Sequence, residues 1–425
     1  MAFVFYQILA VLLWVQAVCS SSADSRDAWV TVWTSMPQLT EPANLPPPPY
    51  NATDSVFQNT TIRQTIRLTQ PGNKIRLRLS NAFGLTDLSV TEVTVSLSDE
   101  DQLGTRAIQS GTTKKVLFSG TSDIIIPNGA LIVSDPIDLT VKTLQTMTID
   151  IYLAAGQQGG AITSHPGSRT TSWMSFGNWV GAPNITDSSA LSTDHWYFIS
   201  AVEALSPPQT RSCVIIGDSI TDGRGSDTNA NNRWPDLLLQ RMQHHPSTSS
   251  IALLNQAAGG NRILADGLGP NVLSRIDRDV LAQSRVEYAL IFEGVNDIGV
   301  AAPTPEAQQL IGDRLIAAFK QVATRIHAAG IPVYGTTITP FSAPEGQEGV
   351  QPYSHPEREK TRQRVNAWIR HSGVFDAVVD FDKVLRDPEV PARLRGEFDS
   401  GDYLHPNVKG YKAVAESFPL GLFEK

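Results

Sequence analysis

The spacing of apolar residues changes at Ser206, Pro207 and Pro208, and this change limits the chain to a fold with two parts. Before it, apolar and polar residues alternate with a period of two, which is typical of half-buried antiparallel strands. After it, continuous apolar runs alternate with amphipathic segments, which is typical of a parallel sheet covered by helices on both faces. The pattern predicts an antiparallel β-sandwich domain at residues 28–205 and an α/β domain at residues 209–425.

Short segments of alternating polarity, separated by Gly, Pro, Asn and Asp turns, fill the first part of the chain. Regularly spaced short strands of this kind indicate a sandwich of two sheets. The proline run at residues 46–49 predicts a stiff surface connection. We expect strands at residues 65–68, 75–79, 90–97, 115–118, 130–133, 146–153 and 196–202.

The second part alternates apolar strands with helices, and ligands of such sheets bind beyond the carboxyl ends of the strands. We expect strands at residues 213–216, 251–255, 288–292, 333–338 and 377–380. We expect helices at residues 234–243, 305–329, 357–372 and 408–418. The composition is 41% hydrophobic and 18% charged over 425 residues, which is enough to form a core without disulfides.

Polar or glycine-containing turns follow the first three predicted strands of the second part. Ser219 follows the first strand, Gly260 the second and Asn296 the third, so one rim of the sheet gathers them. Close to the C-terminus, Asp402 precedes His405 by three residues, and no other of the eight histidines has an acidic residue at that spacing. The sequence therefore predicts a cluster of these five residues.

The chemistry of acyl transfer gives each of these residues a role. A serine hydroxyl needs an adjacent base, usually a histidine that a third group orients, and these needs fit Ser219, His405 and Asp402. A developing oxyanion needs fixed donors, each typically worth roughly 10²–10³ in rate. Three groups can provide them: the backbone N–H groups of Ser219 and Gly260 and the side-chain amide of Asn296. Glycine suits the second position because a residue without Cβ lets the backbone approach the substrate.

These four blocks resemble those of the SGNH, or GDSL-type, hydrolases. The resemblance is carried by residues 217–221, 255–261, 294–297 and 402–405 and covers residues 209–425. It implies a flavodoxin-like three-layer α/β/α parallel sheet, a Ser219, His405 and Asp402 triad, an acyl-enzyme intermediate and an oxyanion hole from Ser219, Gly260 and Asn296. Gly260 is preferred to Gly259 because its distance from Asn255 matches the second block of the family.

Each of these residues also has a structural interpretation. A serine after a strand is often a helix N-cap, and Asn296 alone fits a turn amide equally well. Asp297 is interpreted as structural. An α/β-hydrolase would carry a GxSxG elbow, which the sequence lacks, and the close spacing of Asp402 and His405 is unusual for that fold. The combination of blocks therefore favours the SGNH interpretation.

No cofactor and no metal are expected. His244 and His245 lie at the polar end of a predicted helix without a matching Cys or acidic cluster, which disfavours zinc. Cys213, inside an apolar strand, is interpreted as a buried small hydrophobe. The net charge of −8 and the absence of a Lys/Arg run disfavour nucleic acid and anionic membranes. We expect a monomer.

The first 20 residues are interpreted as a secretory signal peptide. Residues 3–18 are apolar, too short for a comfortable membrane span, and small residues follow, although no Lys or Arg precedes the apolar run. Sequons at Asn51, Asn59 and Asn184 support export and glycosylation. The C-terminus carries no lipid-anchor signal. We therefore expect a secreted, extracellular protein without a membrane anchor.

Two polar loops, residues 222–233 and 340–356, border the predicted rim and suit a hydroxylated substrate better than a lipid. We therefore expect an esterase for O-acylated, above all acetylated, carbohydrate. The first alternative is a lipase or lysophospholipase, and the second is a carbohydrate-binding protein whose α/β domain is catalytically dead. Activity is expected to fall as the pH drops through the pKa of His405, about 6.5 if unperturbed. Acyl transfer to an alcohol instead of water stays open.

Overall fold

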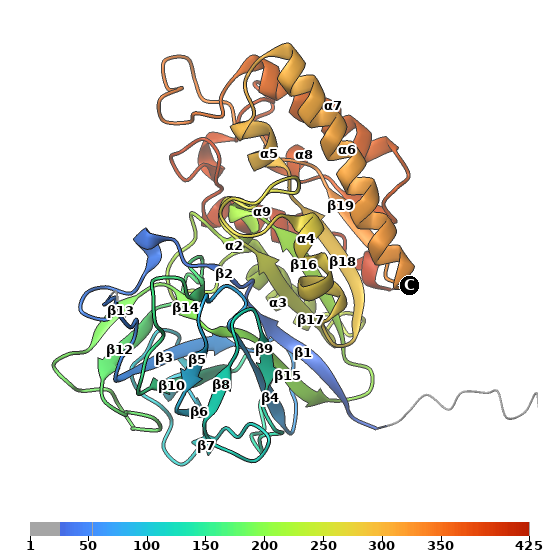
Figure 1. Ribbon diagram of the computed structural model, residues 1–425. Helices are drawn as coiled ribbons and strands as arrows, with labels where there is room; N and C mark the ends of the chain where they lie inside the picture. Colours follow the sequence, from blue (N-terminus) through green and yellow to red (C-terminus); the bar gives the residue numbers. More distant parts are fainter. Residues whose placement is uncertain (1–25, 53, 425) are drawn as a thin grey trace, which may run out of the picture.

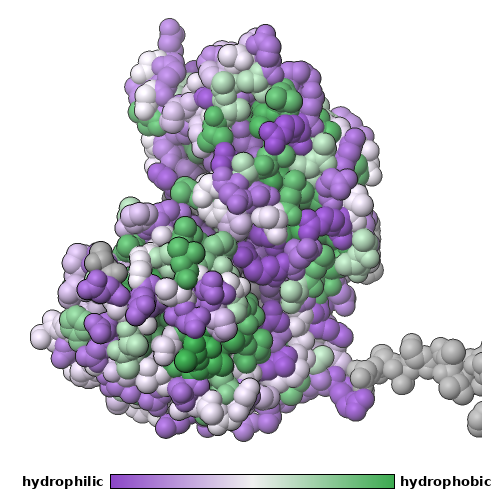
Figure 2. Space-filling model, in the orientation of Figure 1, coloured by the Kyte–Doolittle hydropathy of each residue, from purple (hydrophilic) through white to green (hydrophobic). Residues whose placement is uncertain are grey.

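The computed structural model of the protein describes residues 26–52 and 54–424, so the predicted signal peptide lies outside the described residues. A β domain lies below an α/β domain in Figure 1, and the connection runs through the turn between β15, which ends at Ser206, and β16, which begins at Arg211. Figure 2 shows that the surface is hollowed on its left side, between the two domains.

The β domain is built from antiparallel sheets. A four-stranded sheet has the order β1-β15-β4-β9, and a six-stranded sheet has the order β13-β12-β3-β10-β6-β7. Two smaller sheets, β14-β11-β2 and β5-β8, complete the domain. The strands are β1 (Ala28–Thr34), β2 (Gln38–Leu39), β3 (Thr60–Arg67), β4 (Ile75–Ser80), β5 (Leu88–Val90), β6 (Glu92–Leu97), β7 (Lys114–Lys115), β8 (Ile124–Ile126), β9 (Leu131–Val133), β10 (Thr146–Leu153), β11 (Thr163–His165), β12 (Ser172–Phe176), β13 (Leu191–Thr193), β14 (Trp196–Tyr197) and β15 (Ile199–Ser206).

The core of the β domain lies between its two larger sheets. Val30 and Leu77 from the four-stranded sheet and Ile62 and Ile149 from the six-stranded sheet are fully buried in one cluster. Alternate residues of β4 are buried, as the period-two pattern requires. The predicted sandwich is therefore confirmed as the architecture of this domain.

The α/β domain contains a parallel five-stranded sheet with the order β17-β16-β18-β19-β20. This is the flavodoxin-like order, in which the first strand lies between the second and the third. Gly217 at the end of β16 lies opposite Ala257 of β17 and Phe292 of β18, so these three strands end at one level. The strands are β16 (Arg211–Gly217), β17 (Ile251–Ala257), β18 (Val286–Phe292), β19 (Val333–Thr336) and β20 (Ala377–Val379).

Two groups of helices cover this sheet. α3 (Trp234–Gln243), α8 (Phe381–Leu385) and α9 (Val408–Ser417) pack together, as do α4 (Val272–Ile276), α6 (Pro305–Ala328) and α7 (Pro356–His371). The long helix α6 begins where Thr304 accepts a hydrogen bond from the N–H of Ala307. Its buried residues Leu315, Phe319, Val322 and Ile326 form one stripe at helical spacing.

The predicted fold class is confirmed, and the differences concern short elements. The strand predicted at residues 90–97 is interrupted at Thr91, whose hydroxyl accepts a hydrogen bond from the N–H of Ala154. The short helices α2 (Ser219–Asp222) and α5 (Val295–Val300), together with α4 and α8, were not predicted, because a helix of four to six residues has no apolar period to detect. No helix among residues 26–52 and 54–424 is long and apolar enough to cross a membrane.

Polar contacts join the two domains along β1. The N–H of Ser284 donates to the Thr31 hydroxyl at 2.9 Å, and the Ser212 hydroxyl donates to the Thr31 carbonyl at 3.1 Å. The Thr34 hydroxyl reaches the Asn255 carbonyl on β17 at 3.1 Å. The β domain is thereby held against the strands whose ends carry the candidate site.

Candidate active site

Ser219 occupies the turn between β16 and α2. It is the first residue of α2, and the preceding Asp218 caps the helix by accepting a hydrogen bond from the N–H of Ile220 at 2.9 Å. Ser219 itself is not the cap, so its hydroxyl is free to face the cleft, and only 7% of the residue is exposed. The strand end therefore presents one serine hydroxyl, as the sequence predicts.

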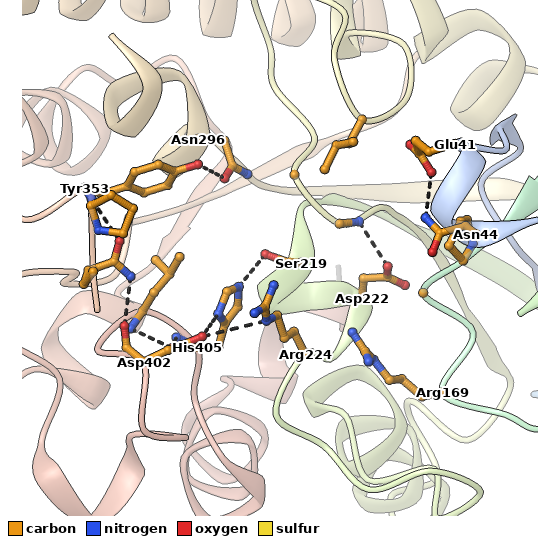
Figure 3. A pocket seen from close by; sticks show the side chains of 18 of the residues that line it. Glu41, Asn44, Arg169, Ser219, Asp222, Arg224, Asn296, Tyr353, Asp402 and His405 are labelled. Carbon is orange, nitrogen blue, oxygen red and sulfur yellow. Dashed lines mark hydrogen bonds and ion pairs between the residues drawn. The ribbon is translucent and has the colours of Figure 1, made fainter. Parts of the chain in front are cut away.

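His405 and Asp402 approach Ser219 from the C-terminal loop (Figure 3). Nδ1–H of His405 donates to Asp402 Oδ2 at 2.7 Å, because a carboxylate oxygen can only accept. Nε2 is then an acceptor, and it lies 2.7 Å from Ser219 Oγ. The other Asp402 oxygen accepts the N–H groups of Leu404 and His405. A hydroxyl, an imidazole and a carboxylate are thus joined in one line.

The electrostatics of this line favour a neutral histidine beside an ionised carboxylate. Burial lowers the pKa of His405; the hydrogen bond and charge of Asp402 oppose this shift, and the charges of Arg224 and Arg169 add to it. Burial tends to raise the pKa of Asp402, but its hydrogen bonds with His405 and the charge of that ring hold it below the usual range. His405 is therefore available as a proton acceptor near neutral pH.

The lowered pKa of His405 predicts where activity is lost in acid. A base must be neutral to accept the Ser219 proton, so activity falls as the pH drops through the pKa of His405. Because this pKa lies below the ordinary 6.5, we expect the acid limb of kcat/KM for 4-nitrophenyl acetate to lie below pH 6.5. A pH–rate profile whose acid limb lies at or above that value would contradict this assignment of the base.

The backbone after β17 presents one free donor. The N–H groups of Ala258 and Asn261 donate to the carbonyls of Gly217 and Ala258, and that of Gly259 donates to Asp222. Among the hydrogen bonds of the described residues, the N–H of Gly260 donates to no protein acceptor. Gly260 has φ +70°, and a Cβ on it would lie 2.6 Å from Leu268. The geometry thus singles out Gly260, not Gly259, as a donor.

The amide of Asn296, on α5, is held from both ends. Nδ2 donates to the Asn261 carbonyl at 2.9 Å, and Oδ1 accepts the Tyr353 hydroxyl at 3.2 Å. An amide nitrogen carries two hydrogens, so the second remains for a ligand. Asp297 accepts the N–H groups of Ile263 and Leu264, which is the structural role expected of it. Tyr353 was not predicted; it comes from the polar loop at residues 340–356.

Asp222 and His165 form a contact between the domains that the sequence did not reveal. Nε2 of His165, from β11, lies 2.9 Å from Asp222 Oδ1, and its Nδ1 lies 3.0 Å from the Met36 carbonyl. Both nitrogens face oxygen acceptors, so a proton must lie between the ring and the carboxyl group. Asp222 Oδ2 accepts the N–H of Gly259 at 3.1 Å. The β domain therefore fixes the residue beside Gly260.

We expect His165→Ala to lower kcat on 4-nitrophenyl acetate by about 10- to 100-fold, because misplacing a reacting group by about 1 Å has effects of this size. Without His165 the buried Asp222 carboxylate loses its partner and no longer fixes the N–H of Gly259. Steady-state kinetics and thermal unfolding would be measured. His327→Ala is the matched control, since His327 pairs with Asp376 at 2.8 Å on the surface. Unchanged kcat in folded His165→Ala would refute this role.

Three buried carboxyl groups, one of them on the residue before Ser219, lie close enough to act on one another by charge. Burial raises the pKa of Asp218 to about 7 and raises the pKa of Glu293 well above its ordinary range, and Asp297 acts on both by its charge. Asp218 Oδ2 and Glu293 Oε2 have no hydrogen-bond partner among the described residues. Arg275 lies 3.5 Å from Glu293 Oε1 and partly balances this charge.

A cleft of about 520 Å³ contains all five residues predicted for the site, namely Ser219, Gly260, Asn296, Asp402 and His405. Its walls come from both domains: Gln38, Glu41, Asn44 and Arg169 from the β domain, and Arg224, Leu268, Val350 and Tyr353 from the α/β domain. The cleft is therefore larger than the triad alone requires and has room for both halves of an ester.

The remaining predicted positions lie outside this cleft. Cys213 is buried in β16, and burial raises the pKa of its thiol. His244 caps the C-terminus of α3, and among the described residues no group of three or more His, Cys, Asp or Glu side chains could hold a metal ion. Asn59 and Asn184 are exposed and Asn51 is half-buried.

Comparisons with known proteins match the α/β half. Residues 213–418 match the family described as GDSL-like Lipase/Acylhydrolase. Similar solved structures include a G-D-S-L family protein from Desulfitobacterium hafniense, with 21% identity and a TM-score of 0.36 over 49% of this chain and 97% of that one. A GDSL-like lipase from Bacteroides thetaiotaomicron has 18% identity and a TM-score of 0.35 over 48% of this chain and 84% of that one. An acetylxylan esterase from Geobacillus stearothermophilus has 19% identity and a TM-score of 0.37 over 49% of this chain and 92% of that one. No curated protein matches.

Proposed function

We propose that the chain is a secreted serine esterase acting on O-acylated carbohydrate. The premise is that residues 213–418 form a domain of the GDSL-like lipase/acylhydrolase family, which makes the chain a carboxylic ester hydrolase. One observation carries the proposal: the hydrogen bonds from Asp402 through His405 to Ser219 end in a cleft that both domains line. The arrangement meets the requirements of nucleophilic acyl transfer.

The proposed reaction has two steps. Ser219 Oγ attacks the ester carbonyl while His405 Nε2 takes its proton, and Asp402 stabilises the imidazolium. The N–H groups of Ser219 and Gly260 and the Asn296 amide hold the oxyanion. The C–O bond to the alcohol then breaks, and the alcohol leaves with the proton from His405. Water, deprotonated by His405, attacks the acyl-Ser219 ester and releases the carboxylic acid and the free serine.

The polar wall that the β domain adds to the cleft supports a carbohydrate substrate. Gln38 and Asn44 both donate to Glu41, at 3.2 and 2.8 Å, so one cluster offers carbonyl, amide and carboxylate groups. Such groups hydrogen-bond to sugar hydroxyls. The three residues line the same cleft as Ser219. An acylated hydroxyl of a saccharide would place its ester at Ser219 and its ring against this wall.

Secretion is part of the same proposal. The leader at residues 1–20 and the sequons at Asn51, Asn59 and Asn184 support it. The side chains of Asn59 and Asn184 are accessible to a glycosylating enzyme, as both residues are exposed. Mass spectrometry of the protein recovered from the culture medium of a eukaryotic host would give the mature N-terminus and the occupied sequons. A protein that stays inside the cell with its first 20 residues uncleaved would overturn this part of the proposal.

The substrate class is tested by hydrolysis of a panel of esters. Acetylated oligosaccharides, feruloylated sugars, triglycerides and lysophospholipids would be offered at equal ester concentration, and the acid released would be titrated. We expect the highest kcat/KM on an acylated saccharide. The rival assignment, a lipase or lysophospholipase, has its own support, because Leu268 and Val350 line the cleft and are each 49% exposed. A preference for the triglyceride or the lysophospholipid would favour it.

A further inference from the structure

Arg169 is a cation of the cleft that the reaction does not use. It lies in the β domain between β11 and β12, is half-buried, and lines the cleft together with Ser219 and His405. Within residues 26–52 and 54–424, its guanidinium makes no side-chain hydrogen bond or ion pair, and its buried Nε has no partner. A guanidinium carries five donors. Those of Arg169 are therefore available to a ligand.

Backbone hydrogen bonds fix the main chain of Arg169 at the cleft. Arg169 has φ +50°, a conformation that residues other than glycine seldom adopt. The Arg169 carbonyl accepts the N–H of Asn229 from the α/β domain at 2.9 Å, and Asn229 Oδ1 accepts the N–H of Thr171 at 2.8 Å. Arg169 is therefore fixed to both domains. Strain of this kind tends to occur at functional positions.

The acidic groups of the cleft already have partners. Asp222 pairs with His165, Asp402 with His405, and Glu41 accepts hydrogen bonds from Gln38 and Asn44. Arg224 is 62% exposed and its Nε lies 3.8 Å from Asp402, while its terminal nitrogens make no hydrogen bond with residues 26–52 or 54–424. Two guanidinium groups thus line the cleft with donors that no described residue uses.

The two arginines lie on the side of the cleft where the alcohol half of an ester would be bound. Both line the same cleft as His405, the ring that protonates the leaving alcohol, and the charges of both lower the pKa of that ring. Figure 3 shows Arg224 and Arg169 below Ser219, whereas Asn296 and Tyr353 lie above it. An ester whose carbonyl oxygen points to Asn296 leaves both of its halves on the side of the arginines, and the alcohol half is the one that must lie beside Nε2 of His405.

We propose that Arg169, assisted by Arg224, binds a carboxylate on the alcohol half of the ester, so that the substrate is an acylated acidic carbohydrate containing uronic acid units. The planar guanidinium fork matches a carboxylate in two parallel hydrogen bonds. Gln38, Asn44 and Glu41, on the same wall, suit the hydroxyl groups of such a sugar. The inference rests on the proposed function, since it assigns the sugar of the same site.

The test compares two substrates that differ in one charge. 4-Acetoxybenzoate carries a carboxylate on its alcohol half, and methyl 4-acetoxybenzoate does not. We expect Arg169→Gln to lower the ratio of kcat/KM for the anionic over the neutral ester by about 10- to 100-fold, the range for a hydrogen bond to a charged group. Arg169→Lys should retain part of the ratio. Arg314→Gln, which removes an exposed charge from α6 outside the cleft, is the matched control and should leave the ratio unchanged.

A second comparison uses saccharides. Acetylated oligogalacturonides and acetylated xylo-oligosaccharides of equal length differ in their carboxylates, and the wild type should prefer the former, less so at high salt. An equal loss on both aryl esters in Arg169→Gln, or none on either, would overturn the carboxylate site. An effect of Arg169 on a lysophospholipid but not on 4-acetoxybenzoate would reassign it to phosphate. If Arg169→Gln lowers the ratio of kcat/KM for the two aryl esters and no saccharide is hydrolysed, only the carbohydrate assignment fails.

Discussion

Replacing Ser219 by alanine is expected to lower kcat on 4-nitrophenyl acetate by about 10⁶-fold, the scale on which a triad loses activity without its nucleophile. The Ser219 hydroxyl supplies the oxygen that forms the acyl-enzyme bond, and the next hydroxyl along the chain, that of Thr221, is directed to Trp234 in the core. The backbone N–H of residue 219 and the cap from Asp218 to Ile220 do not depend on the hydroxyl, so the turn keeps its shape.

The variant should fold and bind substrate as the wild type does. Thermal unfolding and steady-state kinetics would be measured, with Ser226→Ala as the control. The Ser226 hydroxyl donates to the Gly223 carbonyl at 2.6 Å in the next turn, and the variant without it should remain active. A fluorophosphonate should label the wild type at Ser219 and leave Ser219→Ala unlabelled. Absence of labelling in the wild type would indicate a binding protein with an inactive site, and retained activity of Ser219→Ala would place the nucleophile elsewhere.

The sequence predicts the sheet and the rim because both follow from short-range patterns. Continuous apolar runs at β16, β17 and β18 and the long amphipathic helix α6 are visible in the chain itself. A parallel sheet brings the ends of its strands to one level, so Ser219, Gly260 and Asn296 had to share a rim once the strands were assigned. Local pattern and topology together were sufficient for these residues.

The contacts that hold the site in place could not be predicted in this way. His165 and Asp222 lie 57 residues apart and come from different domains, so their contact depends on how the domains dock. Gly167 allows this approach, since a side chain there would overlap the Asp222 carboxylate, but a single glycine in a loop gives no signal of its neighbour. Tyr353 and Arg169 likewise come from loops, whose paths are not set by periodicity.

Gly259 and Gly260 differ in the hydrogen bonds of their backbone N–H groups, which the sequence cannot reveal. The two glycines are adjacent, and the sequence favours Gly260 only through the resemblance, by its distance from Asn255. The structure separates them by their hydrogen bonds, because the N–H of Gly259 donates to Asp222 while that of Gly260 has no protein acceptor among the described residues. A donor that already has an acceptor cannot also stabilise an oxyanion fully.

Asp402→Asn is expected to lower kcat by about 10⁴-fold, because the carboxylate selects the tautomer of the histidine. An asparagine can turn its NH₂ toward Nδ1 of His405, which places the ring proton on Nε2, facing Ser219, so the base no longer accepts. Asp402 also raises the pKa of His405 by its hydrogen bond and charge. The residual activity of the variant should therefore extend to lower pH than that of the wild type.

Asp399→Asn separates this effect from simple damage to the loop. Asp399 accepts the N–H groups of Gly401 and Tyr403 at 3.0 Å and does not contact the imidazole, whereas Asp402 contacts both the backbone and the ring. Loss of loop order alone would therefore lower kcat similarly in both variants and leave the acid limb in place. The wrong tautomer of His405, with its proton on Nε2, would arise only in Asp402→Asn. Equal effects of the two substitutions would mean that Asp402 holds the loop and does not orient the base.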